Sequence, residues 1–316
     1  MFKSVRQACE IAGFLLFTTL LTACQSSPQA DKLKQVGFAS LPPTHEIENV
    51  PFYPQQQFYC GPTTLSEVFG FYDVDISPED IAPKIFIPDK QGSLQLEMIS
   101  AARSYGFLPY SSRGTLTSII EMINDNIPVI VFQNLSIQLL PQWHYAVVIG
   151  HNKQKGTVTL HTGVTERHEM SLALFEKTWA RGNYWFLAPV PPGVASVAME
   201  PFTYINAAYD MLKVGNAEVA LNVLKTATKQ WPSEWLSFFL IANYYFEKGD
   251  ERALQWFSEG YDIAYEQRPF VHNYLLALLE NNRRELAKKV ASKALVSFPK
   301  DEAIASIVQK NNLQFH

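Results

Sequence analysis

Cys60 is the residue of this 316-residue sequence that is best suited to covalent chemistry. The stretch 61–72 predicts a helix that begins directly after it, with a proline suited to the first turn. Because backbone N–H groups at a helix N-terminus stabilise a thiolate, we expect a lowered pKa and a nucleophilic sulfur. Gln55, with Gln56 as second choice, can donate a side-chain N–H to an oxyanion that forms on an attacked carbonyl.

A cysteine nucleophile needs a base, and His144 is the best candidate among the seven histidines. It opens the apolar run 144–150, which predicts a strand, and the start of a strand can aim an imidazole toward a neighbouring helix. The other histidines lie before the domain, in later strands and loops, or in the C-terminal region. The sequence therefore predicts a Cys60–His144 pair in which the imidazole takes the thiol proton.

The elements around this pair mix helices and strands. Helical patterns cover 61–72, 93–105, 116–124 and 172–181, and strand patterns cover 127–132, 144–149, 157–161 and 184–190. Helices come first and an antiparallel sheet follows, which indicates an α+β domain. Prolines at 189–192 and a glycine end the pattern, so we place this domain at 46–191.

The sequence from 201 to 316 is helical and repeats itself every 33 or 34 residues. Small residues recur at Ala220, Ala253 and Ala287 and at Ala227, Gly260 and Ala294, and turn residues recur at Gly215, Gly249 and Asn282. This pattern resembles tetratricopeptide repeats, whose period is about 34 residues. We expect an all-α, tetratricopeptide-like helical-repeat domain that binds a substrate protein or a protein partner.

The N-terminus predicts export. Basic residues precede an apolar stretch at 11–21, which is too short to span a bilayer and leads to Leu-Thr-Ala before Cys24. This resembles the lipobox of bacterial lipoproteins, in which the cysteine is lipidated. It implies a signal peptide over 1–23, a lipidated tether over 24–45 and membrane attachment through acyl chains at Cys24.

Gln25, directly after the lipidated cysteine, points to the outer membrane of a diderm bacterium, with the protein facing the periplasm. Cys9 leaves with the signal peptide and Cys24 carries lipid. Cys60 is then the single thiol of the mature chain, in an oxidising compartment where unpaired thiols are at risk.

The motifs YCGPTTL at Cys60 and WHYAVVIG at His144 resemble those of bacteriocin-processing, double-glycine-leader cysteine peptidases. The resemblance covers about residues 46–190. It implies a papain-like fold, with the cysteine on a helix and the histidine on the sheet, and hydrolysis of peptide bonds. It also implies a glutamine commonly six places before the cysteine. That place is Pro54 here, so Gln55 is our choice for the oxyanion role.

The sequence departs from this family at the residue that orients the histidine. The family has an aspartate on the strand after the histidine, and Thr162 stands at that place. Thr162 and His161 are therefore the candidate orienting residues. Asn152, and Glu166 in the loop expected after the strand, are weaker alternatives. Orientation and tautomer choice are the main tasks of such a residue, although Thr162 cannot stabilise an imidazolium by charge.

The leading prediction is thus a cysteine peptidase, a hydrolase that uses Cys60 and His144 with no metal and no other cofactor. The alternative is a catalytically impaired, peptidase-like lipoprotein that acts as an adaptor or assembly factor. Cell-wall peptide hydrolysis is a third option, but such lipoproteins usually carry Asp-Cys-Ser-Gly, which differs from the motif at Cys60. A net charge of −4 gives no electrostatic case for a nucleic-acid partner.

Overall fold

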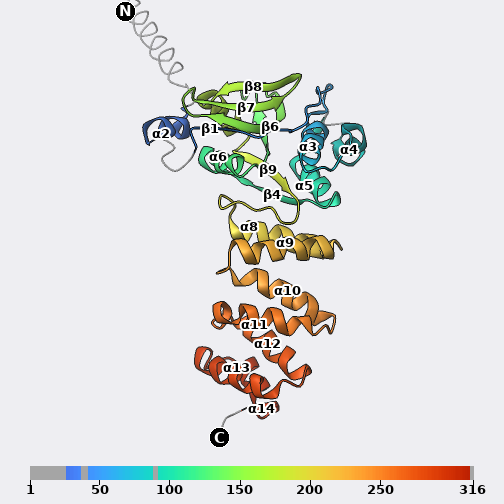
Figure 1. The fold of residues 1–316 in the computed structure, drawn as a ribbon, viewed down its shortest axis with the longest axis vertical. Coiled ribbons are helices and arrows are strands. Elements are labelled where there is room, and N and C mark those ends of the chain that lie inside the picture. Colours follow the sequence, from blue (N-terminus) through green and yellow to red (C-terminus); the bar gives the residue numbers. More distant parts are fainter. Residues whose placement is uncertain (1–25, 37–41, 88–91, 314–316) are drawn as a thin grey trace, which may run out of the picture.

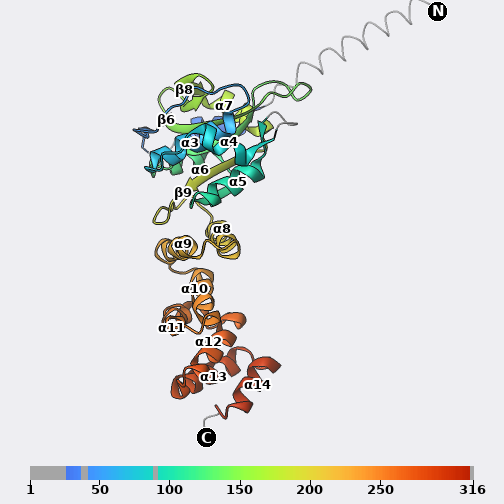
Figure 2. The ribbon, with the colours of Figure 1, turned by 90° about the vertical axis from the view of Figure 1, so that its right-hand side faces the viewer.

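The computed structural model describes residues 26–36, 42–87 and 92–313. An α+β domain lies at one end of the molecule, and a column of helices extends from it to the C-terminus (Figure 1). A second view shows the same column from the side (Figure 2). The predicted fold class, a papain-like domain followed by helical repeats, is confirmed. The lipobox and Cys24 lie outside the described residues.

Part of the segment that we expected to be a tether is instead a docked helix, α2 (Pro28–Val36). Its first backbone N–H groups, at Gln29 and Ala30, donate to the Glu176 carboxylate at 3.0 and 2.7 Å. Glu176 is buried on α7 (Leu172–Arg181), and Ala30 is fully buried. A carboxylate that satisfies the free N–H groups of a helix start stabilises the helix, which the polar composition did not reveal.

Four further helices complete the α+β domain: α3 (Cys60–Phe71), α4 (Pro78–Ile85), α5 (Gln95–Ser104) and α6 (Leu116–Asn124). Helix α3 begins at Cys60 and is buried on every side from residue 61 to residue 69. Gly61 is required there, because a Cβ at this position would lie 2.6 Å from the Oγ atom of Ser93. The nucleophile candidate thus stands at the start of the central helix of the domain.

The sheet has seven strands, and its pairs are antiparallel. Along the sheet lie β4 (Leu108–Arg113), β9 (Trp185–Val190), β5 (Val129–Asn134), β6 (Trp143–Asn152), β7 (Thr157–Thr162) and β8 (Thr165–Ser171), while β1 (Thr44–Glu46) pairs with β6. Strands β2 (Phe86–Ile87) and β3 (Gly92–Ser93) form a separate pair.

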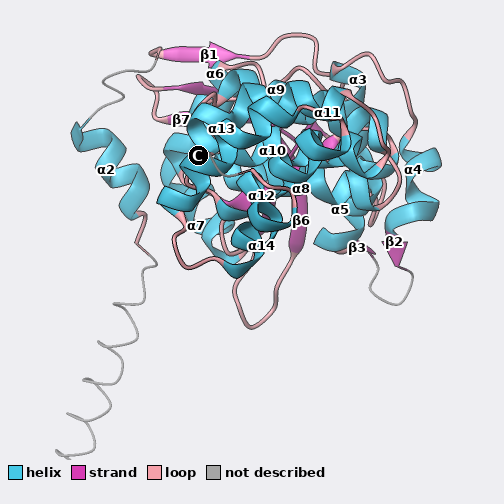
Figure 3. Ribbon diagram, turned by 90° about the horizontal axis from the view of Figure 1, so that it is seen from below, coloured by secondary structure: helices cyan, strands magenta, loops and turns pink. Residues whose placement is uncertain are grey.

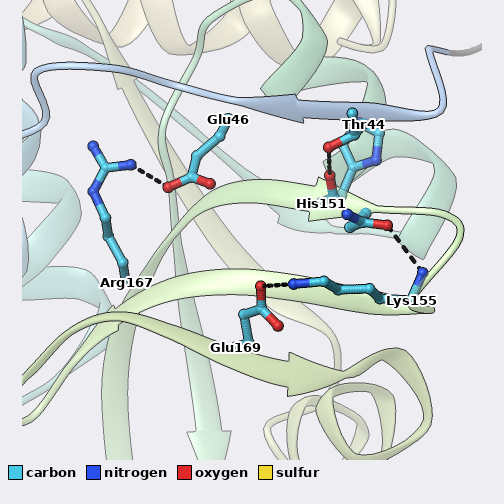
Figure 4. A network of polar contacts seen from close by, with 7 residues as sticks. Thr44, Glu46, His151, Lys155, Arg167 and Glu169 are labelled. Carbon is cyan, nitrogen blue, oxygen red and sulfur yellow. Dashed lines mark hydrogen bonds and ion pairs between the residues drawn. The ribbon is translucent and has the colours of Figure 1, made fainter.

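Polar contacts fasten β1 and β8 to the sheet (Figure 4). Thr44 Oγ1 donates to the His151 carbonyl at 3.1 Å, and Lys155 pairs with Glu169 at 2.7 Å. Arg167 on β8 pairs with Glu46 on β1. The polar segment 165–171 is thus a strand at the edge of the sheet. The prediction of a loop around Glu166 is therefore wrong.

The C-terminal helices pack as successive antiparallel pairs. They are α8 (Pro201–Lys213), α9 (Ala217–Gln230), α10 (Trp235–Glu247), α11 (Arg252–Ala264), α12 (Arg268–Glu280), α13 (Arg284–Ser297) and α14 (Glu302–Lys310). Gly215, Gly249 and Asn282 end α8, α10 and α12 with φ angles of 95°, 65° and 56°. Asparagine can replace glycine there because its short polar side chain tolerates the left-handed region.

No helix in the described part of the chain is both long and apolar enough to cross a bilayer.

Candidate active site

The Cys60 thiol lies at the N-terminus of α3 and is largely buried against β6. Backbone N–H groups of Tyr145, Gly61 and Cys60 itself donate toward the sulfur. Burial has the larger effect and raises the pKa of the thiol, while these hydrogen bonds act to lower it. The expected lowering of the pKa by the helix N-terminus is therefore wrong in its net direction, although the N–H groups are present.

His144 is the second residue of β6, directly before the Tyr145 whose N–H faces the sulfur. Its Nε2 atom lies 2.8 Å from Oγ1 of Thr162, the last residue of β7. When Nε2 donates to this hydroxyl, Nδ1 is the acceptor nitrogen of the ring. Burial lowers the pKa of His144 to about 4, so the ring is neutral at neutral pH.

The contact between His144 and Thr162 follows from the strand register. Val147 pairs with His161, so Ala146 lies opposite Thr162 and His144 is a diagonal neighbour of Thr162 on the same face of the sheet. The residue that stands at the aspartate position of the family thus contacts the imidazole. It does so with a neutral hydroxyl.

Gln55 lies beside the turn between β7 and β8. Its backbone N–H donates to the Gly163 carbonyl at 2.9 Å. Its Nε2 atom is buried and has no hydrogen-bond partner among the described residues. A buried amide N–H without a partner is costly, and a carbonyl oxygen of a substrate would satisfy it.

Gln56, our second choice, points elsewhere. It is exposed, and its Nε2 atom donates to Glu79 on α4 at 3.2 Å. Of the two glutamines, Gln55 is the one whose side-chain N–H groups are not used by another described residue.

The other candidate orienting residues do not approach His144. His161 precedes Thr162 on β7, so its side chain points to the opposite face of the sheet, where its ring packs edge-on against Phe52 at 5.2 Å. Burial lowers the pKa of the His161 ring, and the negative charge of the Glu166 carboxylate acts to raise it. Glu166 therefore affects His161. Asn152 accepts the Lys155 N–H at 2.9 Å at the far end of β6.

A carboxyl that the sequence pattern did not indicate as functional, that of Glu67, is fully buried on α3. Its Oε1 atom accepts the backbone N–H of Tyr53 at 3.1 Å, and its Oε2 atom has no partner in the described part of the chain. Burial raises its pKa to about 8. Glu67 thus fixes the extended segment that leads to Gln55. The available signal was a single charged residue in an otherwise uncharged helix pattern.

Within the described ranges, no group of three or more histidine, cysteine, aspartate or glutamate side chains is arranged to hold a metal ion.

Residues 47–184 match the family model described as "Peptidase_C39 like family", and this match makes the α+β part of the chain a cysteine peptidase-like domain. No curated protein matches the chain significantly.

Three solved structures illustrate what the two parts resemble. The peptidase domain of Streptococcus ComA, a bi-functional ABC transporter, is 25% identical, with 45% of this chain and 99% of that chain covered and a TM-score of 0.37. A double glycine motif protease from an AMS/PCAT transporter, in complex with the leader peptide, is 18% identical, with 46% and 95% covered and a TM-score of 0.36. The second TPR domain of human RPAP3, in complex with an HSP70 peptide, is 13% identical, with 36% and 98% covered and a TM-score of 0.32.

Proposed function

We propose that the protein is a cysteine peptidase that hydrolyses peptide bonds through Cys60 and His144. As the thiol attacks a peptide carbonyl, Nδ1 of His144 takes its proton, and the Gln55 side chain and the Cys60 backbone N–H stabilise the oxyanion. The intermediate then collapses to a thioester and His144 protonates the leaving amine. Water, activated by the same imidazole, hydrolyses the thioester and regenerates the thiol.

One observation carries this proposal: the turn at 162–163 contacts two segments that are distant in the sequence, one with the base candidate and one with the oxyanion-donor candidate. Its Thr162 side chain holds His144, and its Gly163 carbonyl holds Gln55. The residue after His144 then supplies the N–H that faces Cys60. These contacts support a site in which nucleophile, base and oxyanion donor act together, which is the arrangement that acyl transfer requires.

We further propose that the chain is a lipoprotein, anchored in the outer membrane through Cys24 and facing the periplasm. The lipobox-like sequence and Gln25 support this proposal.

The helical repeats would bind the substrate protein or a partner. A cavity of about 470 Å³ between α8 and α10 supports this role, because its lining combines aromatic and charged side chains that include Tyr209, Phe239 and Lys248.

Acylation of Cys60 by p-nitrophenyl acetate tests the catalytic proposal without knowledge of the substrate. His144→Ala should slow acylation by about 10²-fold or more, because the base is lost. Gln55→Ala should slow it by roughly 10²-fold through loss of an oxyanion donor. Gln56→Ala is the matched control and should leave the rate within about twofold. Mass spectrometry of the Cys60 peptide would show that the acyl group is on this sulfur.

The adaptor alternative is favoured by the neutral Thr162 beside His144. If the protein is an adaptor, Cys60 should be acylated at the same slow rate in the native protein and in His144→Ala, Gln55→Ala and Gln56→Ala. That result would contradict the peptidase proposal. Replacing Cys60 by serine in cells would give a second comparison, since an adaptor keeps its phenotype when the thiol is removed.

A further inference from the structure

The connection between β5 and β6, residues 135–142, presents apolar side chains to solvent, and we call it the apolar loop. Leu139 and Leu140 are 84% and 71% exposed, and Ile137 is also exposed. The loop contains no charged residue. Figure 3 shows the chain before β6 projecting beyond the neighbouring elements. Several large apolar side chains on one projecting loop indicate a surface that is covered in the working state.

Trp143 extends this surface toward the candidate active site. It is half exposed, stands directly after the apolar loop and precedes His144. Its indole stacks on Phe132 of β5, with 4.9 Å between ring centroids and 10° between planes. Tryptophan that is partly packed and partly exposed is enriched at the boundary between a membrane and water.

Helix α7 ties the apolar loop to the N-terminal end of the described chain. Arg181, in its last turn, donates to the carbonyl of Ser136 at 2.8 Å and to that of Asn134 at 3.3 Å. Glu176, on the same helix, holds the start of α2. Five residues of helix separate the two side chains, a rise of about 7.5 Å. The loop and the point where the chain enters α2 are therefore fastened to one rigid element.

The proposed anchor leaves little freedom at this point. Ser27 is buried and stands three positions after Cys24, and three extended residues span at most about 11 Å. A bilayer that holds the acyl chains must therefore approach the side of the domain where α2 begins. The apolar loop is fixed to the helix that holds this end of α2.

We propose that the apolar loop inserts into the bilayer that holds the lipid anchor and seats the α+β domain on the membrane surface. This inference rests on the proposed lipoprotein function. The active site would then open next to the bilayer, because His144 follows the membrane-facing Trp143. The substrate class is accordingly a polypeptide that is itself attached to the membrane or leaves it close to the cleavage point.

A fluorescent label at the loop tests insertion. The lipidated protein carrying Cys60→Ser and Leu139→Cys is labelled with an NBD maleimide and reconstituted in phosphatidylethanolamine–phosphatidylglycerol vesicles. The control is Val296→Cys on α13, which is 81% exposed and lies in the column of repeats. We expect the emission at position 139 to shift to shorter wavelength and to rise several-fold, with quenching by spin-labelled lipids. Emission at position 296 should stay as in water.

Flotation of the vesicles separates the two ways in which the proposal can fail. Protein that does not float with the vesicles lacks the anchor, and both the lipoprotein proposal and this inference then fall. Protein that floats but keeps water-like emission at position 139 overturns insertion alone. A response of the same label to a substrate peptide in the absence of vesicles would overturn the membrane proposal in favour of a peptide-binding loop.

Discussion

A hydroxyl in place of a carboxylate changes how the catalytic pair can work. Thr162 holds the imidazole through its hydroxyl, but it carries no charge to stabilise a protonated ring. Burial keeps the pKa of His144 near 4 and that of the Cys60 thiol above its usual value. Both groups are therefore neutral at rest, and in the proposed mechanism the proton moves as the sulfur attacks. Because oxidants react with the thiolate, a thiol that stays protonated at neutral pH is less susceptible to oxidation.

Thr162→Asp should convert the resting site toward an ion pair. A carboxylate beside the imidazole raises the pKa of His144, by about 1 to 3 pH units in comparable sites. The acylation rate of the native protein should fall as the pH drops through about 4, where His144 becomes protonated. In the variant this fall should occur at higher pH, and the rate at neutral pH should rise at least about tenfold.

Thr162→Val is the matched control for this change, because it keeps the shape and removes the hydrogen bond. It should lower the rate by about tenfold or more and leave the acid limb of the profile where it is. An unchanged profile in both variants would show that position 162 does not act on His144.

At the scale of elements, the site depends on how α3 holds the extended segment 50–59. Helix α3 is enclosed by the domain, yet it carries the carboxyl of Glu67, which accepts the Tyr53 N–H. With a pKa of about 8, this group is mostly protonated at neutral pH in the folded protein and ionised in the unfolded chain. The contact fixes the path of the chain toward Gln55 at a cost in stability that increases with pH.

Glu67→Gln should remove this cost. Between pH 6.5 and 8 the folded protein retains a proton on Glu67 that the unfolded chain has lost, so the free energy of unfolding falls as pH rises. The slope approaches about 1.4 kcal/mol per pH unit for one proton. The buried histidines make the free energy of unfolding rise with pH, because their pKa values are lowered in the folded protein. This effect is confined to pH values below about 6.5, where histidines of the unfolded chain are protonated.

Urea unfolding at several pH values between 6.5 and 8 measures this slope. It should be flatter in Glu67→Gln, because the amide cannot ionise and its oxygen still accepts the Tyr53 N–H. Glu48→Gln removes the same charge from an exposed position and should keep the native slope. Equal slopes in the native protein and Glu67→Gln would mean that Glu67 does not titrate in this range.

The elements with a strong pattern could be predicted from sequence, and those that depend on distant partners could not. The helix at 116–124 and the strand around His144 have clear periodicity and appear as expected. Strand β4 contains Pro109, which is tolerated because β4 lies at the sheet edge, and β8 is polar. Helix α2 is stabilised by Glu176, which lies more than 140 residues away in the chain.

The site shows the same division. The contact of Thr162 with His144 follows from strand register, which an alternating pattern can predict. The direction of the Cys60 pKa and the role of Glu67 arise from burial, which depends on the packed domain and not on neighbours in the chain.

At the scale of the whole molecule, the helical repeats are fastened to the α+β domain by specific hydrogen bonds. The Glu200 N–H donates to the Tyr110 hydroxyl at 2.8 Å, and Asn216 Nδ2 donates to the Arg103 carbonyl at 3.1 Å. The segment 191–200, where the pattern indicates a domain boundary, is itself held: the Gly193 N–H donates to Thr226 of α9 at 2.9 Å. These bonds would keep a partner bound at the repeats in a defined orientation toward the candidate active site, as the proposed substrate delivery requires.

Tyr110→Phe and Thr226→Val should loosen this junction without disturbing either core. Each removes one hydrogen bond that holds segment 191–200, worth about 1 kcal/mol, so local opening of this segment should increase roughly fivefold per change. Limited proteolysis under native conditions measures this opening, because cleavage follows the population of the open form when reclosing is fast. Tyr105→Phe and Thr228→Val are the controls, since their hydroxyls bond within one domain. Cleavage in 191–200 at the same rate in all variants would show that the two parts already move independently, and delivery by a fixed geometry would then be wrong.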